Sequence, residues 1–88
     1  MKVTFRQSFA RDLKKVKDQA VLDRVRRAIE QVEGESTTHE LRDLKKMSGP
    51  GNFYRIRVGD YRLGVVVGAG QVEFVRCLPR RNLYRFFP

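Results

Sequence analysis

The sequence of 88 residues contains few of the residues that mark secreted, metal-binding or membrane proteins. It has one cysteine, Cys77, so no disulfide forms within the chain, and a lone thiol is compatible with a reducing cytosol. It has one histidine, His39, and no tryptophan. No apolar run approaches the length of a membrane span, and the opening MKVTFRQSF lacks the apolar core of a signal peptide. We therefore expect a soluble cytoplasmic protein without a membrane partner, and no metal or organic cofactor is indicated.

Acidic residues are also scarce. Ten Asp and Glu stand against 19 Lys and Arg, which gives a net charge of +9. The excess is greater in residues 39–88, where Lys occurs only at Lys45 and Lys46 and the remaining basic residues are Arg. Arg forms bidentate bonds to phosphate and stacks on bases, which Lys does not do. A basic surface of this kind suits nucleic acid or an acidic protein partner.

The most informative stretch is Tyr54–Val67, YRIRVGDYRLGVVV, which has the pattern of a β-hairpin. Two runs of β-branched and aromatic residues flank Gly59-Asp60, and Gly at the first position of a two-residue loop suits a primed turn. This loop fixes the register of the strands, with the opposed pairs Val58 and Tyr61, Arg57 and Arg62, Ile56 and Leu63, and Arg55 and Gly64.

Alternation along these strands predicts one apolar face and one basic face. The apolar face holds Tyr54, Ile56, Val58, Tyr61, Leu63, Val65 and Val67. The basic face holds Phe53, Arg55, Arg57, Arg62, Gly64 and Val66. Like charges directly opposite each other destabilise a sheet, so the Arg57–Arg62 pair is an odd choice for structure alone. An anionic ligand would relieve the repulsion.

The N-terminal part predicts a strand over residues 1–6 followed by two helices. Ser8 can cap a helix with apolar residues at the i, i+4, i+7 spacing, and a second helix is expected over residues 19–33 with Gly34 as its C-cap. The short break near Asp18 predicts an antiparallel helical hairpin. In the connecting segment, residues 35–51, an apolar residue recurs every third position, which indicates one helical turn or an irregular packed segment; these residues are Leu41, Leu44 and Met47.

A last strand is expected over Val72–Leu78, ended by Pro79. The tail RRNLYRFFP is short, basic and aromatic. The order β-α-α-β-β-β predicts an α+β fold, a small mostly antiparallel sheet with the N-terminal helical hairpin packed on one face. No repeat or linker divides the chain, so we expect a single domain over residues 1–88. The apolar hairpin face would meet the helices and the arginine face would be open to solvent.

Three stretches carry a family resemblance, namely LKKMSG before the hairpin, YRIRVGDYRL within it, and VEFVRCLPRRNLYRFFP at the end. With them the chain resembles the RelE/ParE superfamily of toxins, and in particular the RelE-like mRNA interferases. The resemblance implies a RelE-like microbial ribonuclease-type fold. Carried over by position, it also implies an active site made of Arg55, Arg57, Arg62, Arg80 and Tyr84.

The activity implied by the resemblance is that of a type II toxin–antitoxin toxin. Such a toxin is a metal-independent endoribonuclease that cleaves mRNA in the ribosomal A site and inhibits translation. The resemblance also implies a cognate acidic, RelB-like antitoxin and a toxin–antitoxin hetero-oligomer. The sequence leaves open whether this antitoxin covers the helices, displaces the aromatic tail or binds the arginine face.

RNA cleavage without a metal uses the 2′-OH to attack the adjacent phosphorus, and guanidinium groups stabilise the charge that develops on the phosphoryl oxygens. Arg57 and Arg62 would bracket these oxygens, and Arg55 would extend the clamp, with Gly64 leaving room for the RNA backbone. Arg80 would neutralise the leaving 5′-oxygen, while Tyr84 would stack on a base or donate a proton. RNA binding is further expected from four basic residues, Lys45, Lys46, Arg81 and Arg85.

Two departures from the family pattern remove candidates for proton transfer. The best-known member has Lys where this chain has Arg55 and Arg57, and many relatives have His where this chain has Pro79. Arginine is a poor base, and nothing in the sequence brings His39 to the hairpin. We therefore expect a slow or context-dependent nuclease, for which the ribosome supplies positioning.

Each of these features also has a purely structural interpretation. The arginines would then form a solvated face with salt bridges to Asp60 or Glu73, and Tyr84 would pack the tail onto the sheet beside Phe86 and Phe87. Asp60 would be a turn residue, and Cys77 a small buried hydrophobe. Two other functions also remain open, a ParE-like inhibitor that binds DNA gyrase without cleaving nucleic acid, and an inactive RNA-binding module.

Overall fold

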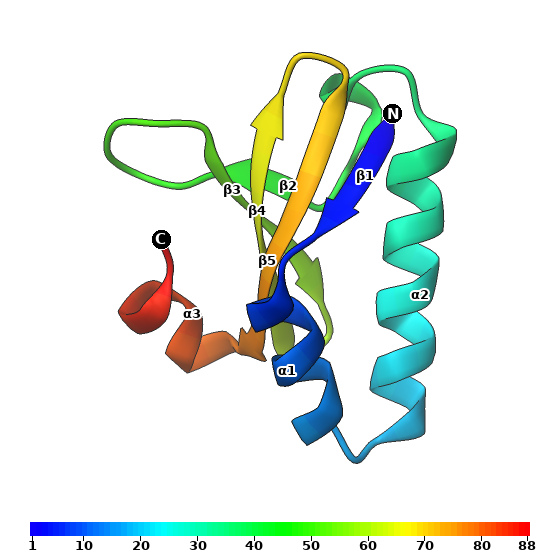
Figure 1. Cartoon of the computed structure of the whole chain (residues 1–88), viewed down its shortest axis with the longest axis vertical. Helices are drawn as coiled ribbons and strands as arrows, with labels where there is room; N and C mark the ends of the chain where they lie inside the picture. Colours follow the sequence, from blue (N-terminus) through cyan, green and yellow to red (C-terminus); the bar gives the residue numbers. More distant parts are fainter.

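The computed structural model describes all 88 residues as one five-stranded sheet with three helices (Figure 1). In chain order the elements are β1 (Lys2–Phe5), α1 (Gln7–Lys15), α2 (Gln19–Gly34), the 3₁₀ turn η1 (Thr38–Glu40), β2 (Leu44–Lys46), β3 (Phe53–Val58), β4 (Tyr61–Gly68), β5 (Gln71–Pro79) and α3 (Arg80–Phe86). The strand order is β1-β5-β4-β3-β2, and only β1 and β5 run parallel. The predicted α+β fold with a mostly antiparallel sheet is confirmed. No helix is long and apolar enough to cross a membrane.

The hairpin has the predicted register throughout. Arg57 lies opposite Arg62, Arg55 opposite Gly64, and Val58 opposite Tyr61. Gly59 has a φ of +57°, and Asp60, like every other non-glycine residue of the chain, has a negative φ. A positive φ at the first loop position alone is the pattern of a type II′ turn. The sequence of this turn therefore determines which side chains share each face of the sheet.

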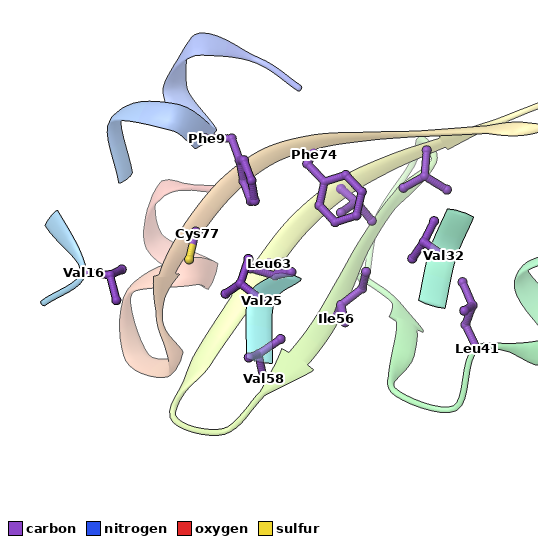
Figure 2. Packing of buried hydrophobic residues seen from close by; sticks show 12 residues of the cluster. Phe9, Val16, Val25, Val32, Leu41, Ile56, Val58, Leu63, Phe74 and Cys77 are labelled. Carbon is purple, nitrogen blue, oxygen red and sulfur yellow. The ribbon is translucent and has the colours of Figure 1, made fainter. Parts of the chain in front are cut away.

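The apolar face of the hairpin meets α1 and α2, as predicted, and together they form the larger core cluster (Figure 2). Phe74 and Leu63 are fully buried, and Phe9 of α1 and Val32 of α2 pack against the same layer. Cys77 belongs to this cluster, where burial, with a smaller contribution from the charge of Asp12, raises its pKa to about 12. The thiol is thus a small buried hydrophobe, in agreement with the prediction.

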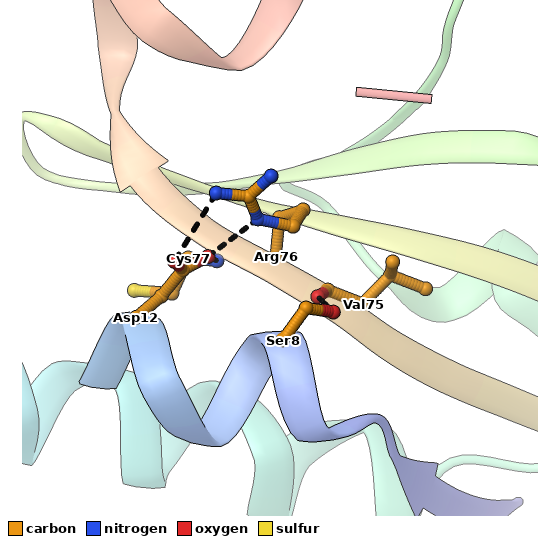
Figure 3. Close-up of polar contacts among 5 residues, drawn as sticks. All are labelled: Ser8, Asp12, Val75, Arg76 and Cys77. Carbon is orange, nitrogen blue, oxygen red and sulfur yellow. Dashed lines mark hydrogen bonds and ion pairs between the residues drawn. The ribbon is translucent and has the colours of Figure 1, made fainter. Parts of the chain in front are cut away.

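Helix α1 contributes polar side chains to the edge of β5 (Figure 3). β1 pairs with β5 only as far as Phe74, so the rest of β5 has no strand on that side. The Ser8 hydroxyl donates to the Val75 carbonyl at 2.6 Å, and the Asp12 carboxylate accepts from the Cys77 N–H at 2.9 Å. Ser8 and Asp12, four residues apart on one face of α1, thereby make the hydrogen bonds that a neighbouring strand would otherwise make.

Three details of the helical hairpin differ from expectation. Ser8 is not the N-cap of α1, because the helix begins at Gln7 and its N-cap, Arg6, makes no side-chain capping bond. Asp18, expected only to mark the break, caps α2 by accepting from the Ala20 N–H at 2.9 Å. Gly34 is the last helical residue and not the C-cap, which is the extended Glu35.

The connecting segment contains a strand, β2, where one helical turn or an irregular packed segment was predicted. β2 pairs with β3, with Leu44 opposite Ile56 and Lys45 opposite Arg55. No helical turn forms over Leu41–Met47; the one turn of this segment, η1, ends before it, and Leu41 and Met47 flank β2 and are buried. A strand of three residues with two exposed lysines is typical of a protected sheet edge.

The tail forms helix α3, and this corrects the prediction that the arginine face is open. Leu83 and Phe87 are buried in a second cluster with Met47 and Val75, on the opposite side of the sheet from the main core. Phe53 and Val66 of the hairpin pack against this cluster, so α3 covers part of the basic face. The arginines of the hairpin lie on the part of the basic face that α3 does not cover.

The prediction that Gly64 leaves room for RNA is wrong, because the ring of Phe87 occupies the space beside it. A Cβ on Gly64 would lie 2.8 Å from two ring carbons of Phe87. Such contacts are too short for carbon atoms, so the absent side chain at Gly64 is what lets the end of α3 approach the sheet.

We expect Gly64→Ala to destabilise the protein by about 1–3 kcal/mol, because the new methyl group overpacks the contact with Phe87. Gly34→Ala is the matched control, since a Cβ there meets nothing within 4 Å. Urea unfolding of both variants, and of a Gly64→Ala, Phe87→Ala double-mutant cycle, measures the coupling. Additive effects at Gly64 and Phe87 would contradict this account of how α3 docks.

Candidate active site

Arg62 is the most buried member of the arginine set. The residue is only 7% exposed, although it lies on the face expected to be open. One guanidinium nitrogen, Nη1, donates to the Gly59 carbonyl at 2.7 Å and to the Tyr61 carbonyl at 2.9 Å. These bonds fix the guanidinium against the hairpin turn, and its remaining N–H groups are left to other partners.

The electrostatics of Arg62 identify its neighbours. Burial lowers the pKa of Arg62 from its usual value, and the positive charges of Arg55, Arg57 and Arg80 lower it further, while Tyr84 opposes them. Such charge effects require short separations, because water and salt screen distant groups. The pairing of the strands places Arg55, Arg57 and Arg62 on one face of the hairpin, and Arg80 and Tyr84 line a depression together with Asp60 of its turn.

Arg80 and Tyr84 reach this region because α3 starts at the hairpin turn. Pro79 lies opposite Tyr61, and the Arg80 N–H donates to the Asp60 carbonyl at 2.8 Å. The buried Leu83 anchors the helix, and Tyr84 next to it is 61% exposed. Tyr84 is therefore not a packing residue, and Phe86, also predicted to pack, is exposed as well.

A depression forms where α3 meets the turn. Its lining residues are Asp60, Pro79, Arg80, Arg81 and Tyr84. Asp60 supplies its only carboxylate, and no imidazole lines it. His39 is exposed on η1, at the opposite end of the sheet from the turn (Figure 1). Asp60 was predicted as a turn residue or a salt-bridge partner of the arginines, and its place in this depression depends on α3, which was not predicted.

No carboxylate neutralises the arginine set. The chain contains two ion pairs, Arg6–Glu73 at 3.0 Å and Arg76–Asp12 at 2.7 Å, and neither includes a candidate site residue. The interpretation of the basic face as a surface of salt bridges to Asp60 or Glu73 is therefore wrong. Uncompensated guanidinium groups around a partly buried one favour the binding of an anion.

The four further RNA-binding candidates are all exposed, but the structure separates them. Lys45 lies opposite Arg55 and extends the arginine row onto β2. Lys46 lies opposite Tyr54, so its side chain leaves the other face of the sheet. Arg81 lines the depression, whereas the guanidinium of Arg85 lies 5.7 Å from the centre of the Phe86 ring. Lys45 and Arg81 are thus the two that adjoin the site.

Comparison with known proteins gives a consistent result. The family model described as ParE toxin of type II toxin-antitoxin system, parDE, matches residues 3–84. Toxin RelE3 of Methanocaldococcus jannaschii is 39% identical over 89 residues, and the match covers 100% of both chains.

Solved structures agree in fold. The RelB-RelE antitoxin-toxin complex from Methanococcus jannaschii contains a chain with a TM-score of 0.79 and 35% identity, covering 97% of this chain and 99% of that one. In the archaeal RelE-RelB complex from Pyrococcus horikoshii OT3 the TM-score is 0.73 at 24% identity, covering 93% and 97%. This chain therefore belongs to the RelE/ParE toxin superfamily and is a RelE-like toxin of a type II toxin–antitoxin system.

Proposed function

We propose that the protein is a metal-independent endoribonuclease that cleaves mRNA in the ribosomal A site. The observation that carries the proposal is the uncompensated arginine set around the buried Arg62. A phosphodiester passing through its transition state concentrates negative charge on the phosphoryl oxygens, and preorganised donors stabilise that state more than the ground state. The 39% identity to a protein named Toxin RelE3 supports the same activity.

In the proposed reaction, the 2′-oxygen bonds to the adjacent phosphorus and the bond from phosphorus to the 5′-oxygen breaks. The products are a 2′,3′-cyclic phosphate and a 5′-hydroxyl. Arg57 and Arg62 lie opposite each other on the two hairpin strands, so they suit the two sides of one phosphoryl group. Arg80, held at the turn by its backbone N–H, neutralises the leaving oxygen, and the Tyr84 phenol gives it a proton.

The proton of the 2′-OH needs an acceptor. Guanidinium groups do not serve, because arginine stays protonated at neutral pH. Among the side chains that line the depression with Arg80 and Tyr84, only the Asp60 carboxylate can accept a proton. We therefore assign Asp60 as the general base of the proposed reaction.

Asp60→Asn should lower the cleavage rate on programmed ribosomes by about 10²–10⁴-fold, the usual contribution of a general base. RNA affinity should stay the same or rise, because a negative charge leaves a basic surface. Glu33→Gln, an exposed position on α2, is the control for the change in net charge. Primer extension on the mRNA gives the rate, and cleavage by Asp60→Asn at the rate of the control would refute the assignment.

A ParE-like inhibitor of DNA gyrase is the second candidate, because the matching family model is described as a ParE toxin. The arginine set with an exposed Tyr84 favours cleavage, since a gyrase inhibitor needs no clamp for a phosphoryl group. Induced expression followed by primer extension on cellular mRNA separates the two functions. Codon-phased cuts support the ribonuclease, whereas intact mRNA together with double-stranded DNA breaks supports gyrase inhibition.

The proposed partner in the cell is an acidic RelB-like antitoxin. Similar chains were solved in RelB-RelE complexes from two archaea, and the net charge of +9 here suits an acidic segment that folds on binding. A toxin–antitoxin hetero-oligomer would follow from such an association.

A further inference from the structure

A second basic groove lies on the other side of the Gly59-Asp60 turn, between α2 and the end of β3. Its volume is about 430 Å³. Arg24, Arg27 and Gln31 line it from the helix, and Arg57 lines it from the strand. Asp43 is the only carboxylate in its wall, and it forms no ion pair with these arginines. Two arginines of α2 and Arg57 of β3 therefore line one groove whose wall contains a single carboxylate.

The turn glycine lies between this groove and the candidate active site. A Cβ on Gly59 would lie 2.5 Å from Nη1 of Arg24, so any larger residue would displace that guanidinium. On the same turn, the Gly59 carbonyl accepts from Arg62. Arg57 belongs both to the groove and to the arginine set around Arg62. One turn thus separates two basic surfaces that share a residue.

We propose that this groove binds the phosphodiester backbone of the single-stranded RNA substrate, beside the bond that is cleaved. The strand passes from Arg62, across the Gly59 turn, to Arg24 and Arg27. Guanidinium groups grip phosphates in a bidentate manner, and the amide of Gln31 adds both a donor and an acceptor. This proposal rests on the proposed function, and it adds the path that the bound RNA strand follows beyond the cleaved bond.

The lining favours a phosphate backbone over an acidic peptide. A peptide segment that folds on binding needs apolar pockets for its anchoring side chains. Only Ala28, Ile56 and Val58 are apolar in this groove, and the last two are buried in the core with their side chains directed to α2. An RNA strand requires no such pocket, because charge on its backbone supplies the affinity.

The test compares two double variants with the same change in charge. Arg24→Ala with Arg27→Ala removes the groove arginines, while Arg11→Ala with Arg26→Ala removes two exposed arginines that do not line the groove. Fluorescence anisotropy measures binding to 2′-O-methyl oligoribonucleotides, which cannot be cleaved, over a salt series. Oligonucleotides of about four and about ten nucleotides separate the central site from its extension.

We expect the groove variant to bind the longer RNA at least about 10-fold more weakly than the control double variant. Its slope of log affinity against log salt should fall by about 1.4, as for two lost phosphate contacts on a single strand. Binding of the shorter RNA should be the same in both. Equal losses in both double variants, equal losses for both lengths, or no measurable RNA binding by the unaltered protein would overturn the proposal.

Two further arms identify other occupants. Weaker binding to ribosomes without a change for the free oligonucleotide would assign the groove to ribosomal RNA. Weaker binding to an acidic antitoxin segment alone would assign it to protein. Both results overturn the proposal.

Cleavage of RNA is measured separately from binding. If no variant cuts RNA but the groove still controls RNA affinity, the proposed function fails and the groove stands. If the unaltered protein cuts and the two double variants bind alike, only the groove proposal fails.

Discussion

Arg62→Ala should reduce mRNA cleavage by about 10²–10³-fold and abolish growth inhibition on induction. Loss of one preorganised donor to a developing oxyanion has this magnitude in other enzymes. Arg62 is the member of the set that is buried and held by two backbone carbonyls, so no neighbouring side chain can take its place. Cleavage is measured by primer extension on ribosomes, and toxicity by colony counts after induction.

Two controls accompany this variant. Arg62→Lys keeps the charge but loses the fork of donors, so partial recovery is expected. Arg11→Ala removes an exposed arginine on α1 and should leave cleavage unchanged. Thermal unfolding of Arg62→Ala establishes whether the fold is retained. A folded and fully toxic Arg62→Ala protein would remove the arginine set from the proposed mechanism.

Asp12→Ala should produce the largest loss of stability, on the order of 3 kcal/mol, or roughly 15 °C in Tm for a domain of this size. Asp12 is 6% exposed and accepts from the Cys77 N–H and from Arg76, at 2.7 Å to Nε and 3.2 Å to Nη2. Its removal leaves a buried N–H and a partly buried guanidinium without partners. The Arg76 side chain is 26% exposed and regains some water, which keeps the expected loss at the low end for a buried pair.

The matched control is Asp23→Ala on α2, where the carboxylate accepts from Gln19 at an exposed site. This change should alter stability by less than about 0.5 kcal/mol. A cycle with Arg76→Ala separates the ion pair from the bond to Cys77, because Arg76→Ala leaves the latter intact. Equal stability of Asp12→Ala and Asp23→Ala would contradict the role given to the edge of β5.

The centre of the fold was predictable because local signals there agree with one another. Gly59-Asp60 admits one kind of turn, and strict alternation then places Ile56 and Leu63 in the core. Helices α1 and α2 were predictable from their apolar spacing. Their ends were not, since Ser8, which looks like a cap, instead bonds to β5, a partner 67 positions away in the chain.

The elements that were missed are short, and their apolar side chains have no period of their own. β2 is Leu-Lys-Lys, which lacks β-branched residues and depends on β3 for its conformation. α3 has seven residues, and its one amphipathic signal is the i, i+4 pair Leu83 and Phe87 across its end. Both elements form because they contact the hairpin, and the intrinsic secondary-structure propensity of their residues does not reveal such tertiary contacts.

For the candidate site, the sequence and the resemblance supplied the residues and the sheet faces. The filling of the space at Gly64 by Phe87 and the presence of Asp60 and Tyr84 in one depression both follow from where α3 docks. An element that was not predicted therefore controls the environment of residues that were. The split between Lys45 and Lys46 likewise depends on the register of β2.

The edge of β5 has a consequence for self-association. An unpaired strand edge recruits other strands, and chains at high concentration can join edge to edge into ribbons. Ser8 and Asp12 bond to the Val75 carbonyl and the Cys77 N–H on the edge of β5, and the outer strands β1 and β2 are short and carry Lys2, Lys45 and Lys46. Short edges that carry lysine disfavour pairing between sheets, so we expect the toxin to resist edge-to-edge association when no antitoxin is bound.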